Sequence, residues 1–190
     1  MSASLVGSEM CIRDRNKPVG IVCTEERRER NSIVRFLNYP IRVTYIGRLD
    51  KDSHGLLLMT NNGDIINKMM RAGNQHEKEY KVTVDKEITP EFIKQMSTGV
   101  PILDTVTRPC KVTQIGKYTF TIVLTQGLNR QIRRMCEALG YQVKDLFRTR
   151  VMNIELNGLK DGAYRKLTDA ELNELYEMIK DSSNETVRWE

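Results

Sequence analysis

Two segments that lie far apart in the sequence carry the residues best suited to chemistry. The first is Gly47-Arg48-Leu49-Asp50, where an acidic residue, Asp50, follows a strand-like stretch and stands near a basic one, Arg48. The second is Gln126–Met135, where three arginines open a predicted helix. A carboxylate in a cleft can act as a nucleophile or as a general base. An acid facing arginines in a basic protein points to chemistry on a nucleic acid rather than to binding alone.

Both segments also have plainer interpretations. Asp50 could cap a turn or pair with Arg48, because matches to such short motifs are common by chance. Arg130, Arg133 and Arg134 have the spacing i, i+3 and i+4, which predicts that they share one helix face. Positive charges disfavour a helix N-terminus unless an anion binds there, and we expect phosphate, the Asp50 carboxylate or both. The alternative is an ordinary solvated basic face.

Three other side chains are candidates for the same site. Tyr80 shares one face of a predicted strand with Val82 and Val84, so its ring could belong to the core. In a site that handles a nucleobase, the same ring would offer a stacking face and a proton acceptor. Arg148 and Arg150 lie two residues apart on an extended stretch, which predicts that they share a face. They either extend the basic surface or are simply solvated.

The elements that must position these residues mix strands and helices without regular βαβ alternation, which predicts an α+β domain. Apolar and alternating runs predict strands at 19–24, 43–47, 55–60, 79–85, 110–115 and 118–125, and an extended stretch at 144–156. Helical spacing and capping residues predict helices at 32–38, 64–71, 89–97, 129–139 and 168–179.

The composition narrows the class of protein. The 190 residues fit one domain, and a net charge of +5 favours a polyanionic partner. No apolar run approaches the length of a membrane span, so we expect no membrane partner. The four cysteines show no C-x-x-C spacing and there are two histidines, which favours neither a zinc site nor a disulfide framework. We therefore expect a cytoplasmic protein without a metal or cofactor.

The two ends of the chain differ from its middle. Residues 1–15 show no clear period and join abruptly to Asn16, and we expect them to be a non-native, loosely packed leader. Residues 16–182 would form the catalytic domain. Residues 183–190 would form a frayed C-terminal tail.

Six segments, in this order and at this spacing, resemble the pseudouridine synthases of the ribosomal small- and large-subunit family. They are 17–20, 46–50, 55–63, 77–80, 99–102 and 129–135. Within the family the F type, which acts on 23S rRNA, is the most similar, because Leu128 stands where sister enzymes usually carry Arg. The resemblance implies the pseudouridine synthase catalytic fold, a mixed and largely antiparallel sheet with flanking helices and a central active-site cleft.

The resemblance also implies roles for individual residues. Asp50 would be the essential catalytic aspartate, and Arg133 would pair with it and orient it. Arg48 would hold the flipped-out nucleotide or fill its place in the stack. Tyr80 would stack on the uracil and assist removal of the C5 proton. The remaining candidates for contact with RNA are Asn129, Arg130, Gln131, Arg134, Arg148 and Arg150.

The implied reaction is isomerisation of uridine to its C-glycoside, which needs no redox step, metal or cofactor. The expected partner is 23S rRNA, with a tRNA anticodon-loop uridine as a second candidate, and we expect a monomer. Whether Asp50 attacks the sugar or removes a proton from C2′ is left open by the sequence. The family usually carries an N-terminal S4-type RNA-binding module, and the F type often a lysine-rich C-terminal extension. We therefore expect this chain to be a fragment that holds the catalytic domain.

Two other functions fit parts of the pattern. One is an RNA-binding module on the same fold that has lost catalysis; the presence together of Asp50, Tyr80 and Arg133 argues against it. The other is a glycosidase. That chemistry usually needs two acids flanking the bond, and Asp50 is the one convincing acid.

Overall fold

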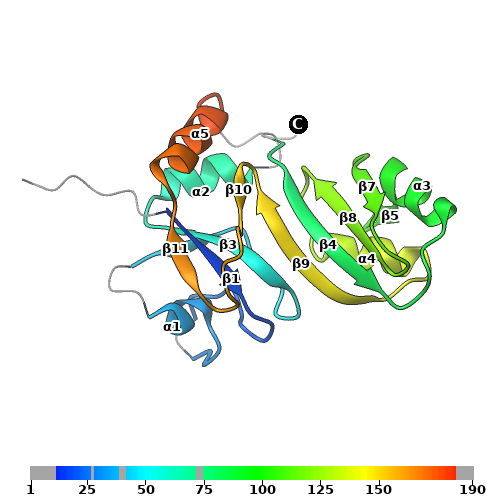
Figure 1. The fold of residues 1–190 in the computed structure, drawn as a ribbon, viewed down its shortest axis with the longest axis horizontal. Coiled ribbons are helices and arrows are strands. Elements are labelled where there is room, and N and C mark those ends of the chain that lie inside the picture. The colour runs from blue at the N-terminus through cyan, green and yellow to red at the C-terminus, as the bar shows by residue number, and fades with distance from the viewer. Residues whose placement is uncertain (1–11, 27, 39–41, 72–74, 183–190) are drawn as a thin grey trace, which may run out of the picture.

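One mixed sheet runs through both halves of the molecule (Figure 1). The computed structural model describes residues 12–26, 28–38, 42–71 and 75–182, and nine strands of these ranges form the sheet. Along its main path the order is β11 (Tyr164–Lys166), β1 (Ile12–Lys17), β3 (His54–Thr60), β9 (Val143–Val151), β4 (Lys78–Val84), β8 (Thr119–Leu124) and β7 (Lys111–Gln114). Two pairs complete it: β2 (Thr44–Ile46) with β3, and β10 (Ile154–Glu155) with β9. The strands β5 (Pro101–Ile102) and β6 (Thr105–Val106) form a separate two-stranded sheet.

The two halves join where β3 and β9 pair in parallel, and every other strand pair is antiparallel. The junction is short, with His54 opposite Phe147 and Gly55 opposite Arg148. Gly55 has a φ of +107°, and a Cβ there would lie 2.3 Å from the Arg148 carbonyl oxygen. Only glycine permits this approach. The junction therefore fixes Arg148 beside the loop that precedes β3, and the predicted largely antiparallel sheet is confirmed.

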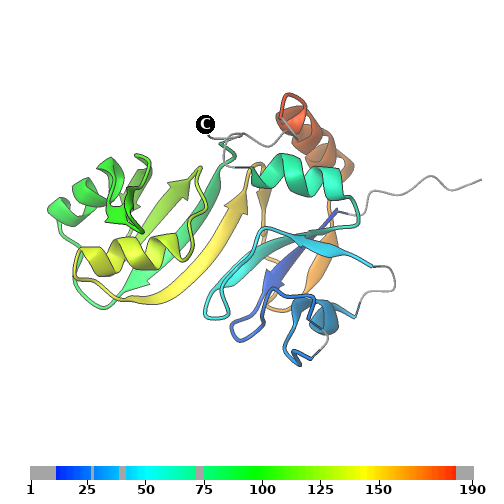
Figure 2. The same cartoon turned by 180° about the vertical axis from the view of Figure 1, so that it is seen from behind.

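Among the residues that the structure describes, five helices pack on this sheet: α1 (Ile33–Leu37), α2 (Gly63–Met70), α3 (Pro90–Thr98), α4 (Gln131–Ala138) and α5 (Asp169–Ile179). Ser32, Asn62 and Thr89 cap the first three by accepting backbone N–H groups with their side chains. In Figure 2, α2 and α4 lie toward the viewer on opposite sides of the β3–β9 junction. Within the described ranges, none of the helices has the length and apolarity needed to cross a bilayer.

Each half has its own apolar core between the sheet and its helices. In one half, Phe92 of α3 and Met135 of α4 share a cluster with Phe120 of β8. In the other, Leu56 of β3 and Leu175 of α5 belong to a second cluster. Because the two apolar cores are separate, polar side chains can lie at the boundary between the two halves.

The central strand β3 is buried on both of its faces. Leu57 and Met59 point away from the α5 side and join Ile33 of α1 in a third cluster.

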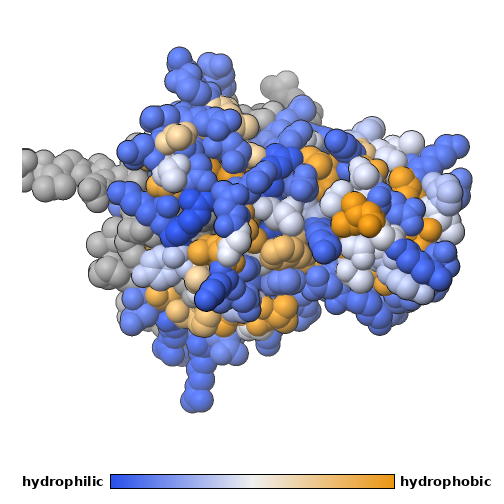
Figure 3. Space-filling view, in the orientation of Figure 1, coloured by the Kyte–Doolittle hydropathy of each residue, from blue (hydrophilic) through white to orange (hydrophobic). Residues whose placement is uncertain are grey.

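The broad face of the sheet seen in Figure 3, opposite to α2 and α4, is mostly hydrophilic with scattered apolar groups. Solvation of one face is usual for an antiparallel sheet.

Most of the predicted elements are confirmed, including β2, β3, β4, the β7–β8 hairpin, and helices α1, α2, α3 and α5. The strand predicted at 19–24 is wrong. Val22 makes only an isolated bridge with Ser32, because its backbone bonds to Asn31 and Ile33 around the start of α1. The strand β11 was not predicted, since its three residues are too few to show an alternating pattern.

The prediction of a loose leader is wrong for its last four residues. The strand β1 begins at Ile12 and pairs with β3 on one side and β11 on the other. A strand that lies between two partners can form both ladders of backbone hydrogen bonds without an alternating side-chain pattern. The sequence therefore carried no signal for β1. Residues 1–11 and the tail 183–190 lie outside the described residues. That residues 1–15 are non-native, and that the catalytic domain begins at residue 16, stay predictions.

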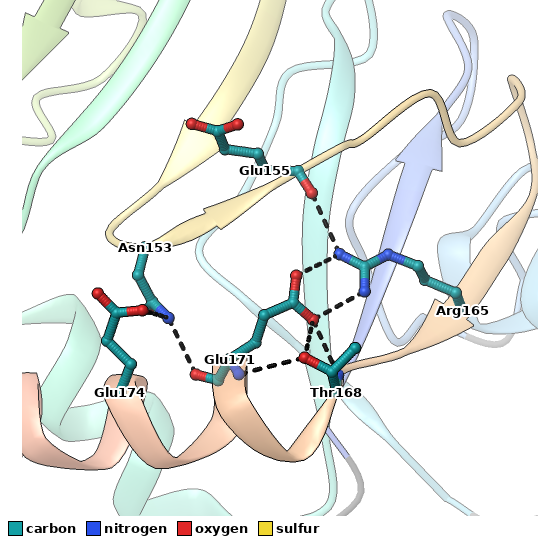
Figure 4. Close-up of polar contacts among 6 residues, drawn as sticks. All are labelled: Asn153, Glu155, Arg165, Thr168, Glu171 and Glu174. Carbon is teal, nitrogen blue, oxygen red and sulfur yellow. Dashed lines mark hydrogen bonds and ion pairs between the residues drawn. The ribbon is translucent and has the colours of Figure 1, made fainter.

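A polar cluster secures the start of α5 (Figure 4). Thr168 and Glu171 form a capping box: the Thr168 hydroxyl accepts from the Glu171 N–H, and the Glu171 carboxylate accepts from the Thr168 N–H. Arg165 of β11 donates two hydrogen bonds of 2.7 and 2.8 Å to the same carboxylate. These hydrogen bonds, first of all those from Arg165, lower the pKa of Glu171 to about 2.

We expect Glu171→Gln to lower the free energy of unfolding at pH 7 by about 1–2 kcal/mol, because it removes the bidentate ion pair with Arg165, whereas the amide can still complete the capping box. The folded-state pKa of Glu171 lies below its ordinary value of 4.5, so this stabilisation is present above pH 4.5 and is lost as the pH falls toward 2. Urea denaturation at pH 7 and at pH 3 measures both effects. Glu177→Gln, at an exposed position of the same helix, is the control. A difference from the unaltered chain that is as large at pH 3 as at pH 7 would contradict the assignment.

Candidate active site

A cavity of about 470 Å³ lies between the two halves, where the sequence predicted a central cleft. Its walls come from the loop after β2, the end of α2, the strands β4 and β9, and the loop before α4. It brings together most of the predicted site residues: Arg48, Asp50, Tyr80, Asn129, Arg130, Gln131 and Arg148. Arg133, Arg134 and Arg150 do not line it.

The loop that carries Asp50 is anchored from several sides. The buried Lys17 ammonium donates to the Ser53 carbonyl oxygen at 2.7 Å. The Arg133 guanidinium donates to the Asp52 carbonyl oxygen at 2.9 Å and to the Ser53 hydroxyl at 3.4 Å. The Leu49 N–H donates to the buried Cys23 sulfur at 3.4 Å, and burial raises the pKa of that thiol. A loop anchored in this way holds the Asp50 carboxylate in one position, as a nucleophile or general base requires.

The ion pair of Asp50 is made with Arg130, not with Arg133. The Arg130 Nη1 lies 3.7 Å from an Asp50 carboxylate oxygen, and 33% of the Asp50 side chain is exposed. The predicted pairing of Arg133 with Asp50 is therefore wrong in this structure. Arg133 lies one helical turn further on, and its guanidinium reaches the backbone of the Asp50 loop instead. Its hydrogen bonds thus connect α4 with the loop that carries Asp50.

The helix α4 begins two residues later than predicted. Arg130 is its N-cap and has left-handed backbone angles, φ 49° and ψ 36°, so Asn129 and Arg130 lie outside the helix. Such strained residues cluster at functional sites. Of the three arginines predicted to share a face, Arg130 and Arg133 both reach the loop at residues 50–53, whereas Arg134 folds back onto Asn129. Gln131 is buried and holds the loop by accepting from the Leu128 N–H.

Tyr80 and Arg48 lie at different depths of the cavity. Tyr80 is half-buried and packs against the apolar clusters of both halves, so its ring is held firmly in the cavity wall. Arg48 is exposed and lies at the cavity rim. A ring held in the wall and an exposed cation outside suit a base that enters from solvent.

Arg148 and Arg150 lie on opposite faces of β9, against the prediction. The β4–β9 ladder pairs Glu79 with Arg150 and Tyr80 with Arg148, so three residues of β9 stand opposite two of β4. This bulge inserts one residue and reverses the alternation. Arg148 therefore lies beside Tyr80 in the cavity and is 1% exposed. Arg150 lies on the other face, in ion pairs with Glu77 and Glu79.

The structure adds residues that the sequence argument did not single out. Lys78, Arg71 and His76 also line the cavity. Lys78 had a signal: it stands two positions before Tyr80 on the same strand, so alternation puts both on one face. His76 had none, because its place depends on a contact with Ser182 far along the chain.

Comparison with known proteins places this geometry in a family. Residues 15–138 match the family described as RNA pseudouridylate synthase. The chain is 37% identical, over 168 residues, to the ribosomal large subunit pseudouridine synthase B of Bacillus subtilis. That alignment covers 84% of this chain and 68% of the relative. The chain belongs to the RNA pseudouridylate synthase family. The family predicted from the six segments is confirmed.

Two further comparisons refine this membership. The chain is 61% identical to the dual-specificity RNA pseudouridine synthase RluF of Escherichia coli K12 over 170 residues, which confirms the predicted likeness to the F type. That alignment covers 90% of this chain and 59% of the relative, so the chain spans about three fifths of the relative's length. A crystal structure of a pseudouridylate synthase superposes with a TM-score of 0.82 at 28% identity, over 88% of this chain and 74% of the other. The pseudouridine synthase fold is thereby confirmed.

Proposed function

We propose that the chain is an RNA pseudouridine synthase that converts a uridine of 23S rRNA to pseudouridine. The observation that carries the proposal is the anchored Asp50 carboxylate in a cavity lined with basic side chains, beside the half-buried ring of Tyr80. The relatives support the substrate class, since one is a ribosomal large subunit pseudouridine synthase and another is a dual-specificity RNA pseudouridine synthase. We propose a tRNA anticodon-loop uridine as the second substrate.

The target base must leave its stack to reach Asp50, which costs a few kcal/mol. Stacking on the Tyr80 ring would offset part of this cost, because stacking of a base on an aromatic side chain contributes about 1–3 kcal/mol. The exposed Arg48 at the rim is placed to hold the flipped nucleotide or to fill the gap that it leaves. The resemblance to the family implies both roles, and the burial of Tyr80 and the exposure of Arg48 support them.

The reaction breaks the N1–C1′ bond, turns the uracil ring, and joins C5 to C1′. Asp50 either attacks C1′ or removes a proton from C2′, and both routes need the ionised carboxylate. The Arg130 guanidinium lies 3.7 Å from that carboxylate and places a positive charge beside it. Tyr80 is placed to assist loss of the C5 proton. N1 takes up a proton, so the product is an isomer of the substrate and no external group is consumed.

The basic side chains around the cavity would hold the RNA backbone. Arg130 and Asn129 stand at its edge, exposed to solvent, and Arg134 supports Asn129 from α4. Arg150 is committed to ion pairs with acids, so we assign it no direct contact with RNA. We propose that the protein acts as a monomer in the cytoplasm, where its RNA substrates and free thiols would both be found.

The test is pseudouridine formation in 23S rRNA and tRNA from a strain that lacks its own F-type enzyme. The chain and its Asp50→Asn variant are incubated with each RNA, and pseudouridine is mapped by carbodiimide-dependent stops of reverse transcription. We expect one stop in 23S rRNA that depends on Asp50. A folded chain that binds both RNAs and modifies neither would support the RNA-binding module instead, and release of free uracil would support a glycosidase.

A further inference from the structure

Two basic side chains lie together on the floor of the cavity without an acidic partner. Arg148 is 1% exposed; its Nε donates to the Leu56 carbonyl oxygen at 2.7 Å, and its Nη2 is buried with no hydrogen-bond partner in the structure. Lys78 also lines the cavity, and in the described part of the chain its ammonium group makes neither a hydrogen bond nor an ion pair. Buried donors of this kind are normally satisfied.

The strands direct the nearby acids away from these two cations. Glu77 and Glu79 flank Lys78 on β4, and alternation sends both to the opposite face, where they pair with Arg150. The bulge in β9 puts Arg150 on that face and leaves Arg148 on the cavity face. The alternation of β4 and the bulge of β9 thus pair Arg150 with two acids. They leave Lys78 and Arg148 without a counter-ion on the cavity face.

This arrangement is unfavourable until an anion arrives. Burial, together with the positive charge of Arg148, lowers the pKa of Lys78 to about 8. Arg148 likewise lowers the pKa of the buried Lys17, after the larger effect of burial. The positive charges of the buried Arg148 and the half-buried Lys78 repel each other, and an anion between them would remove both the repulsion and the unsatisfied Arg148 donor.

The position of the pair favours the base over the phosphates of the nucleotide. Both phosphates of a nucleotide within RNA continue into the chain, so they must stay near the cavity mouth. The base is the part that reaches the floor. Arg148 is the cross-strand neighbour of Tyr80, and Lys78 lies two residues before Tyr80 on the same strand face. A ring stacked on Tyr80 therefore has both cations within reach of its edge.

We propose that Lys78 and Arg148 hold the departing uracil ring as an anion, through its carbonyl oxygens. The inference rests on the proposed function. When the N1–C1′ bond breaks, its electron pair stays on N1 and spreads over the ring to the carbonyl oxygens. The same pair later forms the C5–C1′ bond, the C5 proton leaves, and N1 is protonated. This holds whether Asp50 attacks C1′ or takes the C2′ proton. Fixed cations beside the developing charge stabilise the step that creates it.

The first experiment measures the site without requiring catalysis. The probe is free 5-nitrouracil, which is ionised at neutral pH and changes its absorption spectrum on ionisation. We expect the full chain to bind its anion at least about ten-fold more tightly than the Lys78→Met variant does. Lys78→Arg keeps the charge and should retain binding. Lys81→Met, at an exposed position of the same strand, is the matched control and should bind like the unaltered chain.

Inorganic phosphate distinguishes the two sources of an anion. A flat anion can stack on Tyr80 and a tetrahedral one cannot, so phosphate should compete only weakly with 5-nitrouracil. If phosphate displaces the probe at comparable concentration, the cations hold a backbone phosphate and the proposal is overturned. Equal binding of 5-nitrouracil by the Lys78→Met variant and the unaltered chain would overturn it as well.

The second experiment follows one turnover on substrate RNA. We expect Lys78→Met to slow pseudouridine formation at saturating RNA at least about ten-fold while RNA affinity stays unchanged, and Lys78→Arg to restore most of the rate. A full-speed Lys78→Met variant would refute the ring site and leave the isomerase in place. Binding of 5-nitrouracil that depends on Lys78, in a chain that makes no pseudouridine on any RNA, would uphold the ring site and refute the isomerase.

Discussion

Replacing Asp50 by Asn is expected to slow pseudouridine formation by at least about 10⁴-fold, which corresponds to about 5.5 kcal/mol of transition-state stabilisation. The amide has nearly the shape of the carboxylate but can neither attack C1′ nor accept the C2′ proton. Asp50 is partly exposed, and its loop is held by contacts from Lys17, Arg133 and Cys23 that do not use the carboxylate. The variant should therefore fold normally.

Single-turnover kinetics on the substrate RNA measures this loss, with circular dichroism and urea denaturation as checks on the fold. Asp52→Asn is the matched control, because Asp52 is exposed two residues away and contributes its backbone carbonyl rather than its carboxylate. The control should keep the rate of the unaltered chain. A folded Asp50→Asn variant with near-normal turnover would remove Asp50 from the mechanism.

Replacing Arg133 by Met is expected to slow the reaction by about 10²- to 10³-fold, although Arg133 makes no ion pair with Asp50 in this structure. Its guanidinium holds the Asp52 carbonyl and the Ser53 hydroxyl, so its loss frees the loop that carries the catalytic carboxylate. A displacement of about 1 Å at a reacting group can cost about 10²-fold in rate. We expect RNA affinity to change far less, since Arg133 is half-buried and committed to the loop.

Rate at saturating RNA and dissociation constant, measured separately, distinguish this role from a contact with RNA. Arg134→Met, one residue along the same helix, is the matched control, because Arg134 contacts Asn129 rather than the Asp50 loop. It should keep the rate within a few-fold. A loss of affinity without a loss of rate in Arg133→Met would show that Arg133 binds phosphate and that the loop holds Asp50 by itself.

The sequence determined the features that depend on neighbours along the chain. Alternation gave β4 with Tyr80 on its inner face, capping residues gave the starts of α1, α3 and α5, and six ordered segments gave the family. Those patterns are local, because a strand or helix repeats its side-chain directions at a fixed period. The α+β class and a basic cleft that contains Asp50 followed from them.

The tertiary structure decided which side chains meet in that cleft. Arg130, rather than Arg133, faces Asp50, because a left-handed N-cap turns it out of the helix. A single inserted residue in β9 separates Arg148 from Arg150, and no period in the sequence marks it. The parallel contact at Gly55 brings Arg148 to the floor beside Lys78. Bulges and strand junctions depend on the partner strand and not on the repeat of the chain itself, so only the folded molecule fixes them.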